Sequence, residues 1–339
     1  MLKPFIVRVV ERQDLSEEEA SQAMAHIMEG EGLPTQIASL LTALRMKGET
    51  KGEITGFART MRAKAVRIRA QTPEGVVDTC GTGGDNSGTF NISTTVAFVA
   101  AGGGLTVAKH GNRSVSSRSG SADVLEALGV KIANPPRKVE ACLQEHGLAF
   151  LFAPSFHPAM KHALLPRREI GIRTVFNLLG PLTNPAGATV HLLGVYREDL
   201  MKPVAEVLKN LGSKAALVVH GADHCDEISI TGETAICQLK DGAIENYRIA
   251  PEEVGLKKAS LETIRGGTPE QNAAILLKIL NGEPGPARDV VLLNAGAVFM
   301  AAGKVGGFKE GIEVARESIE SGQALKKLNE LIRFSNQEG

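Results

Sequence analysis

The chain of 339 residues has 38 Lys and Arg against 38 Asp and Glu, so its formal net charge is zero. Apolar residues make up 43% and charged residues 22%, which is typical of a globular protein with one large or two ordinary domains. No segment approaches about 18 consecutive apolar residues, charges at Arg8, Glu11 and Arg12 argue against a signal peptide, and zero net charge argues against general nucleic-acid binding. We therefore expect a cytoplasmic protein that acts on small molecules, with no membrane or nucleic-acid partner.

The first seventy residues are predicted to be helical. Ser16 and Glu19 have the spacing of a capping box, and Pro34 and Gly48 are placed to begin and to end a second helix. A third helix is expected from about residue 53 to residue 69. We interpret its basic side chains as a solvated face rather than a phosphate site; they are Arg59, Arg62, Lys64, Arg67 and Arg69.

From about residue 76 onward, short apolar runs alternate with helical patterns, which predicts βαβ units and a mostly parallel sheet. The Asp241-Gly242 pair predicts a hairpin between about residues 228 and 249, and two or three helices are expected after residue 269. The segment 157–185 is rich in basic residues and proline, and we expect it to pack with the N-terminal helices.

These patterns predict an α/β protein with a small α-helical N-terminal domain and a larger α/β domain. We assign residues 1–72 to the helical domain, with part of 160–188 packed on it, and residues 73–339 to the α/β domain. A ligand cleft is expected between the two, because such interfaces favour binding sites.

A glycine-rich motif, Asp78-Thr79-Cys80-Gly81-Thr82-Gly83-Gly84-Asp85, follows a predicted strand and precedes a helix that starts near Ile92. Glycines let backbone N–H groups approach an anion, and a helix N-terminus adds partial positive charge. The motif has neither the G-x-G-x-x-G pattern nor the P-loop ending. We interpret it as a phosphate site rather than only a tight turn.

A second motif, Lys109-His110-Gly111-Asn112-Arg113-Ser114-Val115-Ser116-Ser117, is expected in a loop just past the strand 105–108, where α/β ligand sites gather. Its two cations beside a phosphate loop suit a polyphosphate. His110 could act as an acid or base, and a structural hydrogen bond is an equal alternative.

Two further groups of charged residues follow. Asp226 and Glu227 come after an apolar strand, and adjacent carboxylates suit Mg²⁺ held together with substrate phosphates. Arg167 and Arg168 could bind a carboxylate, although the residues alone favour the interpretation as a surface pair. Four single cysteines are interpreted as inert, because their spacing fits no zinc site; they are Cys80, Cys142, Cys225 and Cys237.

Taken together, the motifs GTGGD, NIST, KHGNRSVSS, DEIS and the block HPAMKHALLPRRE–IGIRTVFNLLGPLTNP closely resemble the anthranilate phosphoribosyltransferase family, in order and over nearly the whole chain. The resemblance implies the fold of the class II phosphoribosyltransferases and nucleoside phosphorylases, with the active site in the hinge cleft and a homodimer formed through the helical domain. It implies Mg²⁺ as the cofactor, two ions per subunit. It leaves open an association with a glutamine amidotransferase subunit of anthranilate synthase.

The resemblance also implies roles for individual residues. Phosphoribosyl pyrophosphate would be bound by Gly81, Gly84, Asp85, Thr89, Asn91, Ile92, Ser93, Thr94, Lys109, His110, Gly111, Asn112, Arg113, Ser114, Val115, Ser116, Ser117 and Ser121. Anthranilate would be bound by Gly81, Asn112 and Arg167, and Mg²⁺ by Ser93, Asp226 and Glu227. The expected reaction is attack of the anthranilate amine on C1 of the ribose as pyrophosphate leaves, the second step of tryptophan biosynthesis from chorismate. It needs no protein nucleophile, and we assign no general base.

Two other functions would use related features. A pyrimidine nucleoside phosphorylase shares the GTGGD motif but needs a different loop from KHGNRSVSS. A nucleic-acid-binding relative of the same fold would carry a strongly basic surface, which the balanced charge opposes.

Overall fold

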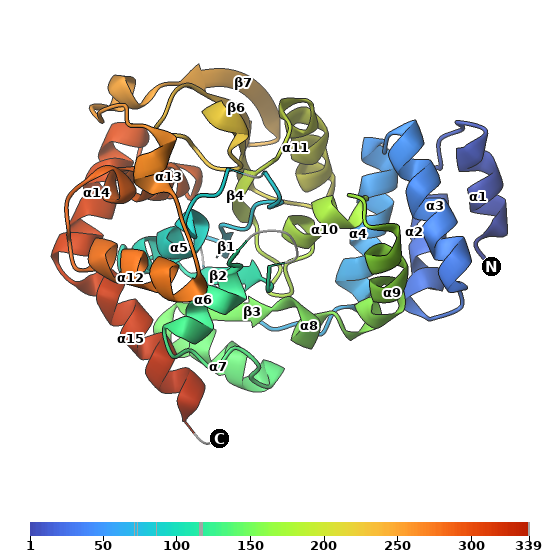
Figure 1. The fold of residues 1–339 in the computed structure, drawn as a ribbon, viewed down its shortest axis with the longest axis horizontal. Helices are drawn as coiled ribbons and strands as arrows, with labels where there is room; N and C mark the ends of the chain where they lie inside the picture. Colours follow the sequence, from blue (N-terminus) through green and yellow to red (C-terminus); the bar gives the residue numbers. More distant parts are fainter. Residues whose placement is uncertain (71, 73, 86, 115–117, 338–339) are drawn as a thin grey trace.

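The computed structural model describes residues 1–70, 72, 74–85, 87–114 and 118–337 (Figure 1). Its N-terminal part consists of four helices in the described residues: α1 (Lys3–Val10), α2 (Glu17–Met28), α3 (Pro34–Lys47) and α4 (Lys51–Lys64). The capping box of Ser16 and Glu19 starts α2 as predicted, because each residue's side chain accepts a hydrogen bond from the other's backbone N–H. The predicted start of α3 at Pro34 and its end at Gly48 are also confirmed.

A later segment of the chain packs on these helices. It contains α8 (Ala153–Phe156), α9 (Lys161–Ile170) and α10 (Phe176–Leu182). Helix α9 lies against α2 and α3, while α10 contacts α4 (Figure 1). Part of residues 160–188 therefore covers the N-terminal helices, while the domain boundary at residue 72 stays a prediction.

The larger part is built on a sheet that has seven strands in the described residues, in the order β3-β2-β1-β4-β5-β6-β7. The strands are β1 (Val77–Asp78), β2 (Val107–Gly111), β3 (Leu148–Phe152), β4 (Val190–Gly194), β5 (Ala215–His220), β6 (Thr234–Lys240) and β7 (Ala243–Ile249). Strands β1 to β5 pair in parallel, and β6 and β7 extend the sheet in antiparallel fashion. The predicted α/β fold class is thus confirmed. The strand order changes direction between β1 and β4, and ligand sites form at the carboxyl ends of strands at such a point.

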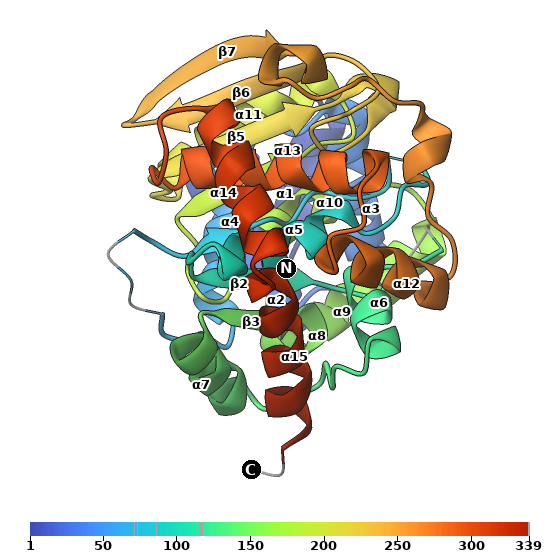
Figure 2. The same ribbon diagram turned by 90° about the vertical axis from the view of Figure 1, so that its left-hand side faces the viewer.

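The sheet separates two apolar cores, and β5 shows this separation. Leu217 and Val219 belong to the core shared with α5 and α13, whereas Ala216 and Val218 belong to the core shared with α11 and the N-terminal helices. This alternation follows from the two-residue period of a strand. Figure 2 shows α13, α14 and α15 crossing one side of the molecule.

The remaining helices complete the two layers. They are α5 (Ile92–Gly102), α6 (Ser121–Ala127), α7 (Pro136–His146), α11 (Met201–Asn210), α12 (Pro269–Leu280), α13 (Pro286–Ala301), α14 (Phe308–Glu320) and α15 (Gln323–Asn336). Short 3-10 helices occur at Pro158–Met160, Glu198–Leu200, Ala222–His224, Pro251–Val254 and Leu261–Ile264. Within the described ranges, no helix has both the length and the apolar character needed to span a membrane.

Several sequence-based boundaries differ from the structure. The Asp241-Gly242 hairpin between β6 and β7 is confirmed, with both residues at positive φ. Helix α4 ends at Lys64 rather than near residue 69. Four α-helices, not two or three, follow residue 269 in the described part of the chain. Helix α13 is buried on most sides, so its sequence lacks the one-sided apolar stripe that marks a surface helix.

Candidate active site

The glycine-rich loop after β1 lies against the end of β4 and the acidic pair. The Thr82 N–H donates to the Gly194 carbonyl (N–O 2.9 Å), and the Gly83 N–H donates to Asp226 Oδ2 (2.7 Å). A β-carbon on Gly81 would lie only 2.8 Å from Asp226 Oδ2. Gly81 is therefore required because the backbone passes close to a carboxylate.

The start of α5 faces the same acidic pair. The Ser93 N–H donates to Glu227 Oε1 (3.1 Å), so the partial positive charge of the helix end stabilises that carboxylate. The Asn91 side-chain amide donates to the Ser119 carbonyl (3.2 Å) instead of capping the helix. The Thr94 hydroxyl is buried and has no hydrogen-bond partner in the described residues. Ile92 is 1% exposed and packs in the core, so only its main chain can contribute to binding.

Lys109 lies inside strand β2, and the prediction that it occupies a loop is wrong. The residue is only 4% exposed. Its Nζ donates to the Thr79 carbonyl (3.1 Å) and lies 3.5 Å from Ser93 Oγ. The ammonium group is thus held between the glycine-rich loop and the start of α5, where it faces the phosphate site predicted from the sequence.

The Arg113 charge is already paired within the chain. The guanidinium pairs with Glu126 and Asp123, and it lies 5.9 Å from the Phe152 ring centre. The same Asp123 carboxylate accepts the Ser114 N–H (3.0 Å), so it holds the start of the loop.

Other predicted site residues are placed as follows. The Ser121 hydroxyl donates to the Asn112 carbonyl (3.3 Å), the Asn112 side chain accepts the Arg113 N–H (2.8 Å), and Thr89 forms an isolated bridge with Arg265. Gly111 ends strand β2. Val115, Ser116 and Ser117 lie outside the described residues.

Asp85, Asp226 and Glu227 form an acidic cluster. The Asp226 N–H donates to Asp85 Oδ2 (3.1 Å). Desolvation, followed by the charges of Asp85 and Glu227, raises the pKa of Asp226 well above its usual range. Desolvation also raises the pKa of Glu227 to about 7, although the nearby Lys109 charge lowers it. This repulsion would be relieved by a divalent cation.

The acidic cluster does not form a complete metal cage. Within the described ranges, no group of three or more His, Cys, Asp and Glu side chains is placed to hold a metal ion. Mg²⁺ commonly takes one or two carboxylates and completes its shell with water and substrate phosphates. Asp226 and Glu227 fit that mode of binding.

Arg167 carries a partly buried positive charge at the C-terminal end of α9. Desolvation lowers the pKa of its guanidinium, which lies 5.0 Å from the Phe176 ring centre. In the described part of the chain, no carboxylate pairs with it. Its neighbour Arg168 is exposed. Arg167 is therefore available to a carboxylate from outside the chain.

Two buried histidines face each other beside α10. The ring centres of His110 and His157 are 5.3 Å apart, and His110 Nδ1 is 3.0 Å from the Gly180 carbonyl. Burial lowers the pKa of His110 to about 3 and that of His157 to about 4, so both rings are neutral near pH 7. His110 therefore makes the structural hydrogen bond that was one of its two sequence-based interpretations, and such a low pKa makes it a weak base.

Sequence reasoning missed four residues at this site: Asp78, His157, Arg173 and Asn184. Asp78 and Asn184 share a buried hydrogen bond (2.7 Å), and Arg173 stacks on the Tyr196 ring at 4.4 Å. A β-carbon on Gly84 would lie 3.2 Å from the Arg173 guanidinium, so this cation borders the glycine-rich loop. All four residues lie within the motifs named above, but only their contacts with residues far along the chain reveal a role.

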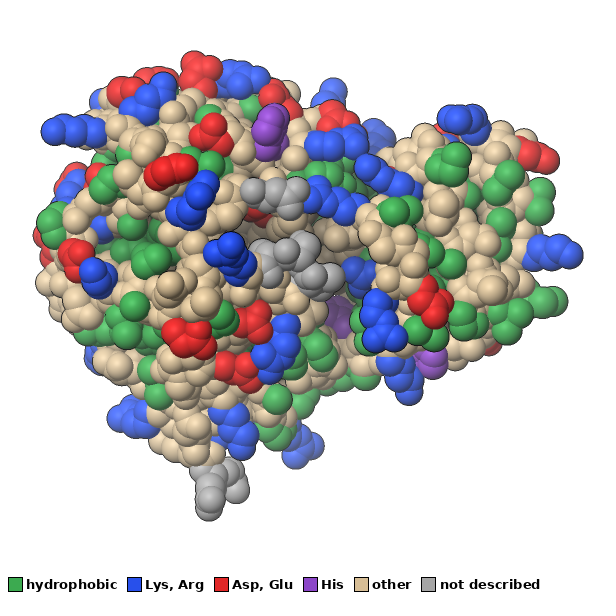
Figure 3. All heavy atoms as spheres, viewed as in Figure 1, with side chains coloured by type: hydrophobic (Ala, Val, Ile, Leu, Met, Phe, Trp, Pro, Cys, Tyr) green, Lys and Arg blue, Asp and Glu red, His purple; other side chains and the backbone are tan. Residues whose placement is uncertain are grey.

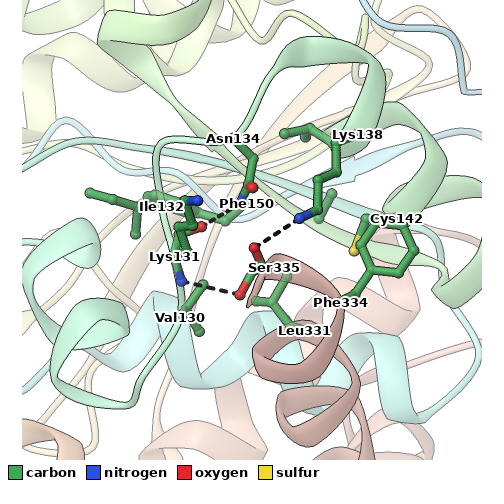
Figure 4. Close-up of a pocket in the computed structure, with 12 residues that line it drawn as sticks. Val130, Lys131, Ile132, Asn134, Lys138, Cys142, Phe150, Leu331, Phe334 and Ser335 are labelled. Carbon is green, nitrogen blue, oxygen red and sulfur yellow. Dashed lines mark hydrogen bonds between the residues drawn. The ribbon is translucent and has the colours of Figure 1, made fainter. Parts of the chain in front are cut away.

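Figure 3 shows the surface hollowed between the N-terminal helices and the α/β part, with Lys and Arg side chains around the hollow. A separate cavity of about 20 Å³ lies between α7, β3 and α15 (Figure 4). Its wall includes Cys142, Phe150 and Phe334, while Lys138 Nζ donates to the Ser335 carbonyl (3.0 Å). A space of this size holds about one water molecule, so we interpret it as a packing gap rather than a substrate site.

Two family models match the chain. Residues 3–65 match the helical bundle domain of the glycosyl transferase family, and residues 73–325 match its a/b domain.

Named relatives match nearly the whole chain. An anthranilate phosphoribosyltransferase of Symbiobacterium thermophilum is 55% identical over 99% of this chain and 98% of its own length. One from Moorella thermoacetica is 58% identical over 98% of both chains. The crystal structure of the Thermus thermophilus enzyme is 47% identical, with a TM-score of 0.93 over 98% of this chain and 99% of its own. The Saccharomyces cerevisiae enzyme in complex with PRPP and Mg is 29% identical, with a TM-score of 0.90 over 98% and 97% of the two chains.

Proposed function

Because this chain belongs to the anthranilate phosphoribosyltransferase family of glycosyltransferases, we propose that it transfers the phosphoribosyl group of phosphoribosyl pyrophosphate to the anthranilate amine. The products are N-(5-phosphoribosyl)anthranilate and pyrophosphate. This reaction is the second step of tryptophan biosynthesis from chorismate. The proposal rests on one observation: the glycine-rich loop, the start of α5, Lys109 and the acidic pair converge at the carboxyl ends of the central strands. These are the groups that a magnesium-bound pyrophosphate needs.

Phosphoribosyl pyrophosphate binds along the glycine-rich loop and the start of α5. Backbone N–H groups and the Lys109 ammonium neutralise the phosphates, and the Thr94 hydroxyl supplies a buried donor. Arg113 would have to leave Asp123 and Glu126 to reach a phosphate, so its assignment depends on a change of side-chain conformation. We keep in the proposed site the other residues that the sequence predicted to bind phosphoribosyl pyrophosphate.

Anthranilate binds on the side of α9 and α10. The Arg167 guanidinium has no carboxylate partner within the described residues and can take the substrate carboxylate as two parallel hydrogen bonds. Gly81 and Asn112 complete this part of the proposed site. The buried neutral rings of His110 and His157 suit an aromatic neighbour, because neither adds a charge beside it.

Asp226 and Glu227 would hold Mg²⁺ together with Ser93, and we propose two ions per subunit. The mutual repulsion within the acidic cluster supports a divalent cation there. When bound, Mg²⁺ neutralises negative charge on the leaving pyrophosphate.

The reaction breaks the bond between C1 of the ribose and the pyrophosphate oxygen and forms a bond from C1 to the anthranilate nitrogen, which then releases one proton to water. The chain places the two substrates in line and supplies the Lys109 charge to the leaving group, so no protein nucleophile is needed. We propose no general base, because burial holds the pKa of His110 at about 3. The homodimer formed through the helical domain and the two-domain division at residues 72 and 73 belong to the same proposal.

The test follows the loss of anthranilate fluorescence after addition of phosphoribosyl pyrophosphate, with and without Mg²⁺. Because the chain has no Trp, little protein emission interferes. Consumption of anthranilate that requires both phosphoribosyl pyrophosphate and Mg²⁺ is the expected result. Phosphorolysis of thymidine or uridine, without use of anthranilate, would replace the proposal with a nucleoside phosphorylase, and salt-dependent DNA binding would favour a nucleic-acid-binding protein.

A further inference from the structure

Asp78 is a buried carboxylate at the end of the central strand β1. The residue is 1% exposed. Its Oδ1 accepts the His110 N–H (3.2 Å), and its Oδ2 accepts a hydrogen bond from the Asn184 amide (2.7 Å). Burial raises the pKa of Asp78 to about 6, whereas the Lys109 charge and these hydrogen bonds lower it. A buried carboxylate is costly unless it is paired, so its place directly before the glycine-rich loop calls for a reason.

Asn184 lies in the segment between α10 and β4, and each of its polar hydrogens has a defined partner. Its amide nitrogen donates to Asp78 and to the Ala108 carbonyl (2.8 Å), while its Oδ1 accepts the Ala186 N–H (2.9 Å). The residue is 3% exposed. With both donors and the acceptor in use, the orientation of the amide is fixed.

The pair holds the end of β2 where the backbone ladder stops. Strand β1 has two residues, and β1 and β2 pair at one position, Val77 with Val107. On its other side, β2 pairs with β3 along its whole length. On the side that faces β1, the main chain before and after Lys109 is therefore held by side chains. The Ala108 carbonyl accepts a hydrogen bond from Asn184, and the His110 N–H donates one to Asp78.

We propose that Asp78 and Asn184 form a buried positioning pair that fixes the end of β2, so that the Lys109 ammonium points at the pyrophosphate of phosphoribosyl pyrophosphate. This inference rests on the proposed function. The pair touches no substrate; it acts through the main chain of residues 108–110.

Asp78→Asn tests this role with little change of shape. A carboxylate accepts both hydrogen bonds, whereas an asparagine offers one oxygen and turns its NH₂ group toward a donor, so one bond must break. Loss of a hydrogen bond to a charged group predicts a fall in kcat/KM for phosphoribosyl pyrophosphate of about tenfold or more. The KM for anthranilate is expected to change by less than about twofold, the usual limit for independent sites.

Asn184→Ser is the second variant, because it keeps Asp78 and removes both amide donors. It should likewise lower kcat/KM for phosphoribosyl pyrophosphate and leave the KM for anthranilate nearly unchanged, and it provides the test if Asp78→Asn does not fold. Ser318→Ala is the matched control: it removes a buried hydrogen bond from the Ser318 hydroxyl to the Val99 carbonyl (2.8 Å) at the other end of α5. Its thermal stability should fall while both KM values remain those of the wild type.

A double-mutant cycle separates positioning from general loosening. The affinity for phosphoribosyl pyrophosphate with Mg²⁺ is measured by calorimetry in wild type, Asp78→Asn, Lys109→Met and the double variant. If Asp78 acts through Lys109, Asp78→Asn should weaken binding by less than about twofold in the Lys109→Met background. An equal loss in both backgrounds, or wild-type kinetics in Asp78→Asn and Asn184→Ser, would overturn the inference. Failure of the wild type to consume anthranilate would instead refute the proposed function.

Discussion

Replacing Arg167 with alanine should lower kcat/KM for anthranilate and leave the KM for phosphoribosyl pyrophosphate nearly unchanged. The Arg167 guanidinium is partly buried, and its described neighbour is the Phe176 ring, 5.0 Å from its central carbon. Burial disfavours the Arg167 charge and lowers its pKa, and no carboxylate of the described chain pairs with it, so a substrate carboxylate beside it would stabilise the charge. Loss of the charged hydrogen bonds to a carboxylate should cost about 2–3 kcal/mol, or about 30- to 150-fold in kcat/KM.

The assay measures initial rates of anthranilate fluorescence loss with each substrate varied in turn. Arg168→Ala is the matched control, since the adjacent side chain is exposed and should leave both substrates unaffected. Aniline, which lacks the carboxylate, supplies the complementary deletion on the substrate. Wild type should prefer anthranilate to aniline strongly, and Arg167→Ala should lose most of that preference. An unchanged preference, or an equal rise of both KM values, would remove Arg167 from the anthranilate site.

The remaining predictions concern the metal site, the loop packing and pH. Asp226→Asn combined with Glu227→Gln should abolish Mg²⁺-dependent turnover; wild-type turnover would refute the metal assignment. A β-carbon at Gly194 would lie 1.5 Å from the Asp226 carbonyl, so Gly194→Ala should raise the Mg²⁺ concentration for half-maximal rate, unlike Gly307→Ala, where nothing lies within 4 Å. Burial lowers the pKa of His191 to about 3 from its ordinary value of 6.5, so between these values only the unfolded chain takes up this proton, and stability falls as pH decreases through that window. At pH 5, protonation of the unfolded chain lowers the free energy of unfolding of the wild type by about 2 kcal/mol. In urea unfolding, the difference in this free energy between wild type and His191→Gln should therefore shrink by that amount between pH 7 and pH 5. A difference that stays constant would contradict the lowered pKa of His191.

Local signals in the sequence predicted the elements that depend on neighbouring residues. The capping box before α2, the Pro34 start of α3 and the Asp241-Gly242 turn each act over a few residues, and the structure has all of them. Elements that are specified by tertiary burial were harder to predict. Helix α13 is apolar on most sides, so its sequence has no one-sided stripe from which the number of helices after residue 269 could be predicted.

The site shows the same division between local and long-range information. The glycine-rich loop and the acidic pair are visible as short motifs, but the bond between Asp78 and Asn184 joins residues 106 positions apart. The sequence likewise shows that Lys109 and Arg113 are cations without showing their directions. Lys109 points between the glycine-rich loop and α5, whereas Arg113 is neutralised by Asp123 and Glu126.

These directions change the charge balance that the composition suggested. The whole chain is neutral, and the charges beside the glycine-rich loop are the cations Lys109 and Arg173 and the three carboxylates of the acidic cluster, since the Arg113 charge is already paired. A polyanion approaching these groups alone would meet an excess of negative charge when the carboxylates are ionised. If the carboxylates only repelled the substrate, removing Asp226 and Glu227 would therefore improve its binding. If they hold Mg²⁺, however, their removal also takes away the cation that contacts the phosphates directly, and affinity falls. The sign of the change in phosphoribosyl pyrophosphate affinity thus distinguishes a metal-binding pair from a pair that only repels.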